Sequence, residues 1–190
     1  MLLINHKDNN QPIIFIHVRK NAGKSIKTWF CQRIDSNIIS VLSYARGDDG
    51  YLHATNIKGF INIMKQYDKL PITFAVKRNP YTRFVSSWDY LNICNNTQID
   101  LDTFLENPIP KTFGTKNGHD WRHSWATQTE FLYNDEKLSV DYLLSFENLQ
   151  EDWNNFRKKM NMDGGNLPFE NKQEYNVTLT EKQKNKIYDF

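Results

Sequence analysis

The amino-acid sequence predicts an α/β fold: three layers, with a mainly parallel central sheet and helices flanking it. Short, apolar, β-branched runs indicate strands buried on both faces, as parallel strands are. These runs are residues 12–18, 38–42, 72–76 and 140–146. Stretches with helical apolar spacing fall between them, and such alternation is typical of a parallel sheet. Because no internal repeat or long linker divides the chain, one domain over residues 1–190 is expected.

The expected helices follow from start signals or from apolar spacing. Ser25 begins a helix after the polar turn at residues 19–24. Pro80 begins another, because proline suits the first helical position. Thr180 and Gln183 have the capping-box pattern and should open the last helix. Further helices are expected over residues 56–67, 101–105, 123–132 and 147–160.

Composition and charge indicate a folded protein that binds a compact anion. The 190 residues are 39% hydrophobic and 14% aromatic, values typical of a globular protein. A net charge of +2 argues against binding of a long nucleic acid. Yet residues 9–34 and 69–88 contain lysines and arginines and no acidic side chain. Two local basic patches in a near-neutral chain favour a small anionic ligand.

Cysteine content and hydropathy bear on the compartment. Cys31 and Cys94 are too few and too far apart for a disulfide framework or a metal motif. The first ten residues contain only one short apolar run, which ends at Ile4 and is too short for a signal peptide, and no stretch reaches transmembrane length. A cytoplasmic protein without a membrane span is expected, and its oligomeric state stays open.

A loop that binds an anion is predicted between the first strand and the following helix. It reads Arg19-Lys20-Asn21-Ala22-Gly23-Lys24-Ser25. A helix N-terminus offers unpaired backbone N–H groups and the positive end of the helix dipole. Gly23 lets the backbone approach the anion closely. Gly23-Lys24-Ser25 is also how the P-loop of nucleotide triphosphatases ends, but that motif requires a glycine where this chain has Val18.

A second motif of this kind follows the strand at residues 72–76. It reads Arg78-Asn79-Pro80-Tyr81-Thr82-Arg83-Phe84-Val85-Ser86 and runs into a helix. Ser86 lies about two helical turns after Arg78, so both side chains can flank one anion. Ligands of open α/β sheets bind at the carboxyl ends of the strands, where both motifs are expected.

The two motifs resemble those of the Golgi-type carbohydrate sulfotransferases, which have a P-loop NTPase-like fold. Residues 15–26 are similar to that family's 5′-phosphosulfate loop, roughly HxPKTGGTS, and residues 74–86 to its 3′-phosphate motif, roughly FxxxRxPxxRxxS. Residues 141–149, 167–168 and 171–172 also look like the family, in the expected order. The family pattern runs on past the segment that ends this chain at Phe190, which suggests a truncated or naturally short chain.

The resemblance implies a sulfotransferase that uses 3′-phosphoadenosine 5′-phosphosulfate (PAPS) as donor, releases 3′-phosphoadenosine 5′-phosphate (PAP) and needs no metal. The acceptor would be a small-molecule or glycan hydroxyl, by resemblance a carbohydrate. Lys20 would neutralise charge on the leaving phosphate oxygen. The implied donor-binding residues are Arg19, Lys20, Asn21, Ala22, Gly23, Lys24, Ser25, Arg78 and Ser86. The chain departs from the family at Arg19, Asn21 and Lys24, where proline and two threonines are usual.

A base must accept the proton of the acceptor hydroxyl. His53 is the first choice, because the pKa of histidine suits the task and its position suits the family; Glu147 is the second. His17 is expected to pack against the loop or orient it. His119 and His123 have a spacing that permits metal binding on a helix, but they are expected to line the acceptor cleft or face solvent.

Two other hypotheses stay open at this point. A P-loop kinase or nucleotide triphosphatase would require magnesium and prefer a triphosphate. A non-catalytic domain of the same fold would bind a nucleotide or a glycan without turnover.

Overall fold

The computed structural model describes residues 2–6, 11–33, 38–43, 70–106, 124, 126–134, 136–170 and 177–189. The chain divides into two compact units: unit 1 is residues 1–77 and 128–172, and unit 2 is residues 78–127 and 173–190. Three histidines considered for the site lie outside the described residues: His53, His119 and His123. The helix expected over residues 56–67 lies outside them as well. That the chain folds as one domain stays a prediction.

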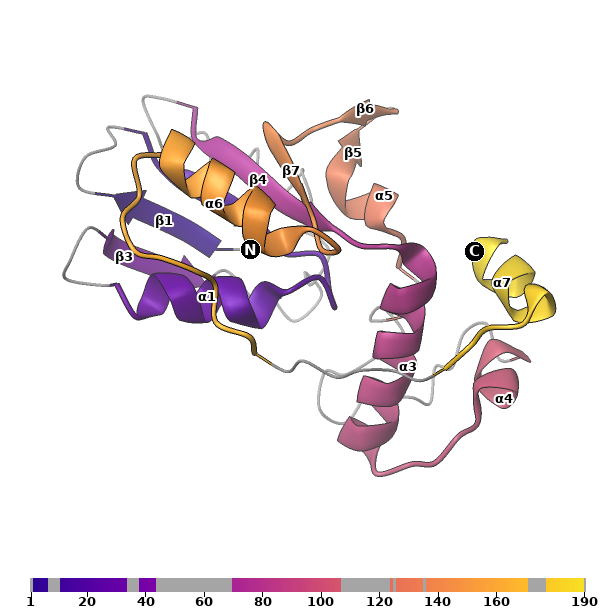
Figure 1. Ribbon diagram of the computed structural model, residues 1–190. Helices are drawn as coiled ribbons and strands as arrows, with labels where there is room; N and C mark the ends of the chain where they lie inside the picture. The colour runs from indigo at the N-terminus through magenta and orange to yellow at the C-terminus, as the bar shows by residue number, and fades with distance from the viewer. Residues whose placement is uncertain are drawn as a thin grey trace. The chain divides into compact units, whose positions relative to one another are not determined.

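Unit 1 is built on a five-stranded sheet with the order β3-β1-β2-β4-β7 (Figure 1). The strands are β1 (Leu2–His6), β2 (Ile13–Ile16), β3 (Ile38–Ser43), β4 (Ile72–Lys77) and β7 (Tyr142–Ser145). β2 pairs with β4 and β4 with β7 in parallel, whereas β1 is antiparallel to both β2 and β3. All strands except β1 therefore point the same way, and the predicted α/β class with a mainly parallel sheet is confirmed.

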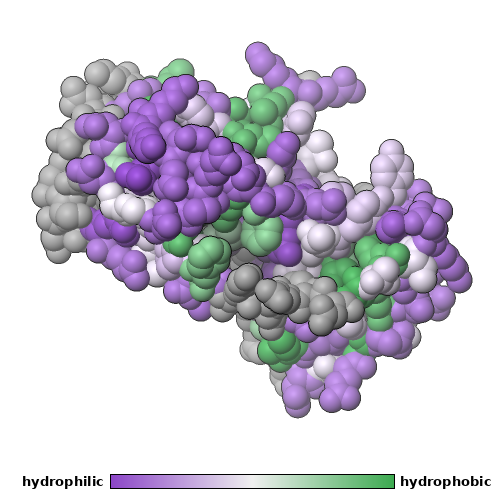
Figure 2. Space-filling view, viewed as in Figure 1, coloured by the Kyte–Doolittle hydropathy of each residue, from purple (hydrophilic) through white to green (hydrophobic). Residues whose placement is uncertain are grey.

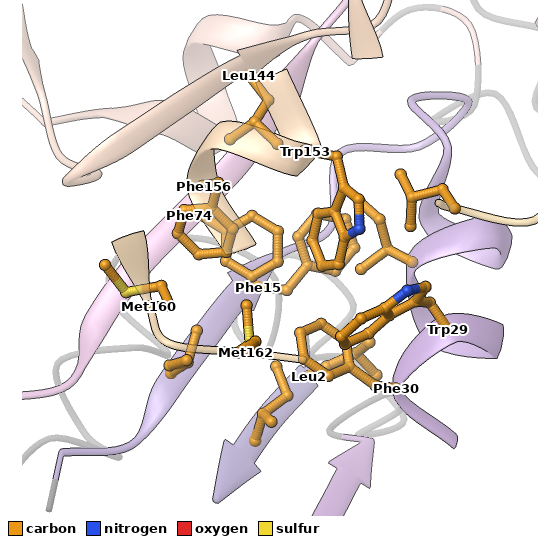
Figure 3. Packing of buried hydrophobic residues seen from close by; sticks show 14 of the residues in the cluster. Leu2, Phe15, Trp29, Phe30, Phe74, Leu144, Trp153, Phe156, Met160 and Met162 are labelled. Carbon is orange, nitrogen blue, oxygen red and sulfur yellow. The ribbon is translucent and has the colours of Figure 1, made fainter. Parts of the chain in front are cut away.

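The sheet of unit 1 is apolar on both faces. Helices α1 (Gly23–Cys31) and α6 (Leu149–Lys159) pack on one face. There Trp153 lies edge-on to Trp29, with ring centroids 4.9 Å apart, and the ring centroids of Phe74 and Phe156 are 4.5 Å apart (Figure 3). Side chains directed to the opposite face are buried as well: Leu3, Ile14, Ile16 and Ala75. This two-sided burial explains why the strands read as continuous apolar runs in the sequence.

The outer face of α6 is polar, so the helix has the pattern expected of a surface helix. Glu151, Asn155 and Lys158 are exposed, whereas Trp153 and Phe156 point into the core. Figure 2 shows this side of unit 1 as predominantly hydrophilic.

A short helix and a small hairpin precede β7 in unit 1. They are α5 (Gln128–Leu132), β5 (Tyr133–Asn134) and β6 (Lys137–Leu138). The helix expected over residues 123–132 is therefore seen only over its last five residues in the described part of the chain.

Unit 2 contains α3 (Pro80–Asn95), α4 (Leu101–Glu106) and α7 (Glu181–Tyr188). Their apolar faces form one cluster, in which the ring centroids of Phe84 and Phe104 are 5.6 Å apart. The predicted capping box is present: Thr180 Oγ1 accepts from the backbone N–H of Gln183, and Gln183 Oε1 accepts from the backbone N–H of Thr180. None of the helices among the described residues is long and apolar enough to cross a membrane.

Candidate functional site

The loop between β2 and α1 has an unusual backbone for residues that are not glycine. Lys20 and Ala22 have φ angles of 65° and 59°, whereas Asn21 between them has a negative φ. Alternation of right- and left-handed residues turns successive N–H groups toward one side and forms an anion-binding concavity. Left-handed geometry costs about 1–2 kcal/mol per non-glycine residue. Strain of this kind concentrates at functional sites.

Helix α1 begins within this loop, at Gly23 and two residues before the expected Ser25, and adds its own N–H groups to the loop. Ala22 is the N-cap residue and has no side-chain oxygen to offer, and the first turn of α1 contains no acidic residue. The first intrahelical bond runs from Ile26 N–H to Ala22 C=O at 3.1 Å. No acidic residue of the helix therefore neutralises the positive dipole end at the N-terminus of α1, and this favours binding of an anion there.

Gly23 is required by the packing of His17 against the start of α1. A Cβ at position 23 would lie 1.9 Å from His17 Nε2, far inside contact distance. The His17 ring also stacks on Phe15, with ring centroids 5.6 Å apart. Burial, together with nearby positive charge including that of Arg19 and Lys27, lowers the pKa of His17 from 6.5 to about 3. His17 is therefore neutral at physiological pH and acts as a packing element beneath the loop.

Asn21 anchors the loop to the rest of unit 1. Its side chain is fully buried, and Nδ2 donates to Val76 C=O and to Gln128 Oε1, both at 2.7 Å. The carbonyl of Val76 can only accept, which fixes the orientation of the amide. Both N–H groups of the Asn21 side chain thus form hydrogen bonds within the protein. If Nδ2 bound a ligand directly, these bonds would have to break, so the predicted role of Asn21 in ligand binding stays a prediction.

The remaining loop residues differ in exposure. Arg19 is only 2% exposed, Lys20 is partly buried, and Lys24 is exposed. Ser25 is buried, and its Oγ accepts from the backbone N–H of Glu170 at 3.3 Å. Lys24 Nζ lies 3.3 Å from Glu170 Oε2. Glu170 was not singled out in the sequence, because nothing local connects it to a loop 145 residues away.

The second motif lies in unit 2 and begins with the residue after β4. Asn79 caps α3: its Oδ1 accepts from Tyr81 N at 3.0 Å, and Pro80 takes the first helical position. Arg78 Nε donates to Thr82 Oγ1 at 3.2 Å, which holds the guanidinium beside the helix start. Ser86 is 4% exposed, two turns farther along α3.

Arg83, the other arginine of this motif, is buried and donates to the backbone carbonyl of Ala126 at 2.8 Å. That bond gives Arg83 a structural contact within unit 2. Of the two arginines, Arg78 is the more accessible to a ligand.

The carboxyl ends of parallel strands meet at one edge of the sheet in unit 1. Within this unit the loop follows β2, and Glu147 lies just past β7. Glu147 is exposed and accepts from Ser145 Oγ at 2.9 Å. Because β2, β4 and β7 are parallel, this edge is where an open α/β sheet binds its ligand.

A comparison with protein-family models finds a match to the model described as "Sulfotransferase family" over residues 4–188. No curated protein sequence matches the chain, and no solved structure does.

Proposed function

The chain belongs to the sulfotransferase family, and we propose that it transfers a sulfuryl group from PAPS to a carbohydrate hydroxyl and releases PAP. The observation that supports this donor best is the loop of residues 19–25. It combines two left-handed residues, one of which is Lys20, with a helix start that has no acidic residue in its first turn. Val18, which is fully buried, stands where a nucleotide-triphosphate P-loop has glycine.

In the proposed reaction the acceptor oxygen attacks sulfur while the bond from sulfur to the bridging phosphate oxygen breaks. Both electrons of that bond stay on the phosphate oxygen, so negative charge develops there. Lys20 is proposed to neutralise this charge, with backbone N–H groups of the loop around it. Preorganised positive groups of this kind contribute about 10²–10³ in kcat. Positioning supplies most of the remaining rate enhancement, as in phosphoryl transfer.

The proton of the acceptor hydroxyl must pass to a base as the new bond forms. The proposed base is His53, chosen because the pKa of histidine suits the task and its position suits the family; it lies outside the described residues. Glu147 is the second candidate, supported by its exposed position after β7.

Recognition of the 3′-phosphate is proposed to distinguish this donor from ATP. Arg78 would supply a charge-assisted contact to that phosphate and Ser86 a hydroxyl. Arg78 is partly exposed and held next to the start of α3 by Thr82, which reduces the side-chain entropy lost on binding.

The donor is tested first, by calorimetric titration with PAP in the presence of EDTA. We expect binding without metal that weakens at least about tenfold in Arg78→Ala and in Lys20→Ala. Lys182→Ala and Lys27→Ala are the matched controls, because each removes one exposed cation from a helix in the same unit as Arg78 or Lys20. If the intact chain does not bind PAP, the proposed donor is wrong.

Turnover is tested with labelled PAPS against sugar, phenolic and lipid hydroxyls. We expect label on a sugar and no turnover above background in Lys20→Ala. Magnesium-dependent binding that prefers ATP would instead support a P-loop kinase or triphosphatase. Tight PAP binding without turnover, unchanged in His53→Ala, would support a non-catalytic binding domain.

A further inference from the structure

A segment after α6 runs along α1 toward the loop. Residues 163–170, here called the strap, pass beside α1 (Figure 1) and contact two residues of α1 and Arg33 just after it. Gly164 C=O accepts from an Arg33 guanidinium nitrogen at 2.7 Å, and Gly165 C=O accepts from Trp29 Nε1 at 3.2 Å. The third contact is Glu170 N–H to Ser25 Oγ. Ser25, Trp29 and Arg33 are spaced by four residues, so the strap follows one face of α1.

Gly164, at the start of the strap, allows this close approach. Gly164 has a φ of 122°, and a Cβ there would lie 2.1 Å from Arg33 Nε. The Arg33 guanidinium also lies over the Trp29 ring, 4.0 Å from its centroid. The strap is therefore held firmly at its Gly164 end, and its other end comes to the first turn of α1.

That other end delivers an acid to the basic loop. Residues 9–34 contain no acidic side chain, and the first turn of α1 has none. The carboxylate of Glu170 lies 3.3 Å from Lys24 Nζ, with the two side chains 30% and 60% exposed. A partly exposed ion pair contributes only about 0–1 kcal/mol to stability. The main effect of this ion pair is therefore to reduce the positive charge that Lys24 presents to a ligand of the loop.

We infer that Glu170 is a built-in counter-anion that competes with the donor's 5′-phosphosulfate for Lys24 and so sets the affinity of the loop. This inference rests on the proposed function and assigns a role to Lys24, one of the positions at which the loop departs from the family pattern. In the ligand-free protein Glu170 neutralises Lys24. When a 5′-anion enters the loop, Lys24 contacts it and loses its pairing with Glu170, so the donor and PAP bind more weakly than the cationic loop alone would allow.

The test is titration of PAP into Glu170→Gln. This substitution removes the charge and keeps the backbone bond to Ser25. We expect binding about three- to tenfold tighter than in the parent, with the gain shrinking as salt is raised. Glu151→Gln, which removes an exposed acid from α6, should leave the affinity unchanged.

Two further arms separate competition for Lys24 from a general charge effect. In a Lys24→Gln background, Glu170→Gln should not increase the affinity for PAP, because the cation for which Glu170 and the ligand compete is then missing. Adenosine 3′-monophosphate, which lacks the 5′-phosphate, should bind the parent and Glu170→Gln equally. Equal or weaker PAP binding in Glu170→Gln, or a gain that persists without Lys24, would overturn the inference while leaving the proposed donor intact.

If the parent binds no PAP, the proposed donor has failed and inorganic sulfate becomes the probe of the loop. Tighter sulfate binding in Glu170→Gln that depends on Lys24 would still support competition at the loop. Unchanged sulfate binding would refute it.

Discussion

The anchoring of the loop by Asn21 leads to a prediction with a defined magnitude. Asn21→Ala removes a buried hydrogen bond to Val76 C=O and a partly buried one to Gln128 Oε1. Each such bond contributes about 1 kcal/mol net, and the partners left buried add to the loss. We expect the free energy of unfolding to fall by about 2–3 kcal/mol.

Asn21→Asp has nearly the same shape and should be worse than Asn21→Ala at neutral pH. The carboxylate would face the Val76 carbonyl oxygen in a fully buried position, where an uncompensated charge costs about 3–5 kcal/mol. Burial raises the pKa of such a carboxyl. An acid with a raised pKa in the folded state destabilises the fold above its unfolded pKa, so Asn21→Asp should lose stability relative to Asn21→Ala as pH rises above about 4.

The assay is urea unfolding followed by tryptophan fluorescence, since Trp29 and Trp153 are fully buried in the same unit. Asn155→Asp, on the exposed face of α6, is the matched control and should change stability by less than about 0.5 kcal/mol. The anchoring argument is refuted if Asn21→Ala also stays within that margin. It is refuted equally if Asn21→Asp and Asn21→Ala have the same stability at every pH.

Three other predictions concern the same loop. Gly23→Ala should destabilise unit 1 by about 1–3 kcal/mol through the clash with His17, and adding His17→Ala should recover part of that loss. In a double-mutant cycle measured by urea unfolding, strictly additive losses would contradict this contact. Ala22→Gly should raise the free energy of unfolding by about 1 kcal/mol, because φ is 59° there, and no gain in urea unfolding would mean that the left-handed geometry is not strained. His17 has its pKa lowered from 6.5 to about 3, so the unfolded chain binds a proton that the folded chain does not. Stability should therefore fall as pH drops through that window, by at most about 1.4 kcal/mol per unit, and His17→Asn should show a shallower decline in pH-dependent unfolding.

Several elements follow from local sequence because their causes are local. β2 is apolar at every position and β4 is apolar except at Thr73 and Lys77, as expected of strands buried on both faces. Pro80 and the Thr180–Gln183 pair begin their helices through chemistry within one turn. The α/β class was predictable for the same reason, since local apolar patterns indicate the order of strands and helices along the chain.

Other elements needed partners far away in the sequence. β1 was not predicted, because only the first three residues of Leu2–His6 are apolar and the segment becomes a strand by pairing with β2 and β3 on its two sides. The β5–β6 hairpin was missed as well, since strands of two residues leave no periodic pattern.

The sequence by itself determined that residues 19–25 form a basic, glycine-containing loop between a buried strand and a helix. Only the tertiary structure decided which residue each loop side chain contacts. Asn21 faces inward to Val76, His17 fills the space that Gly23 leaves open, and Lys24 meets Glu170. The physical reason is that hydrogen bonds, close packing and ion pairs depend on distance in space, and the partners of Asn21 and Lys24 are brought near by the sheet and the strap.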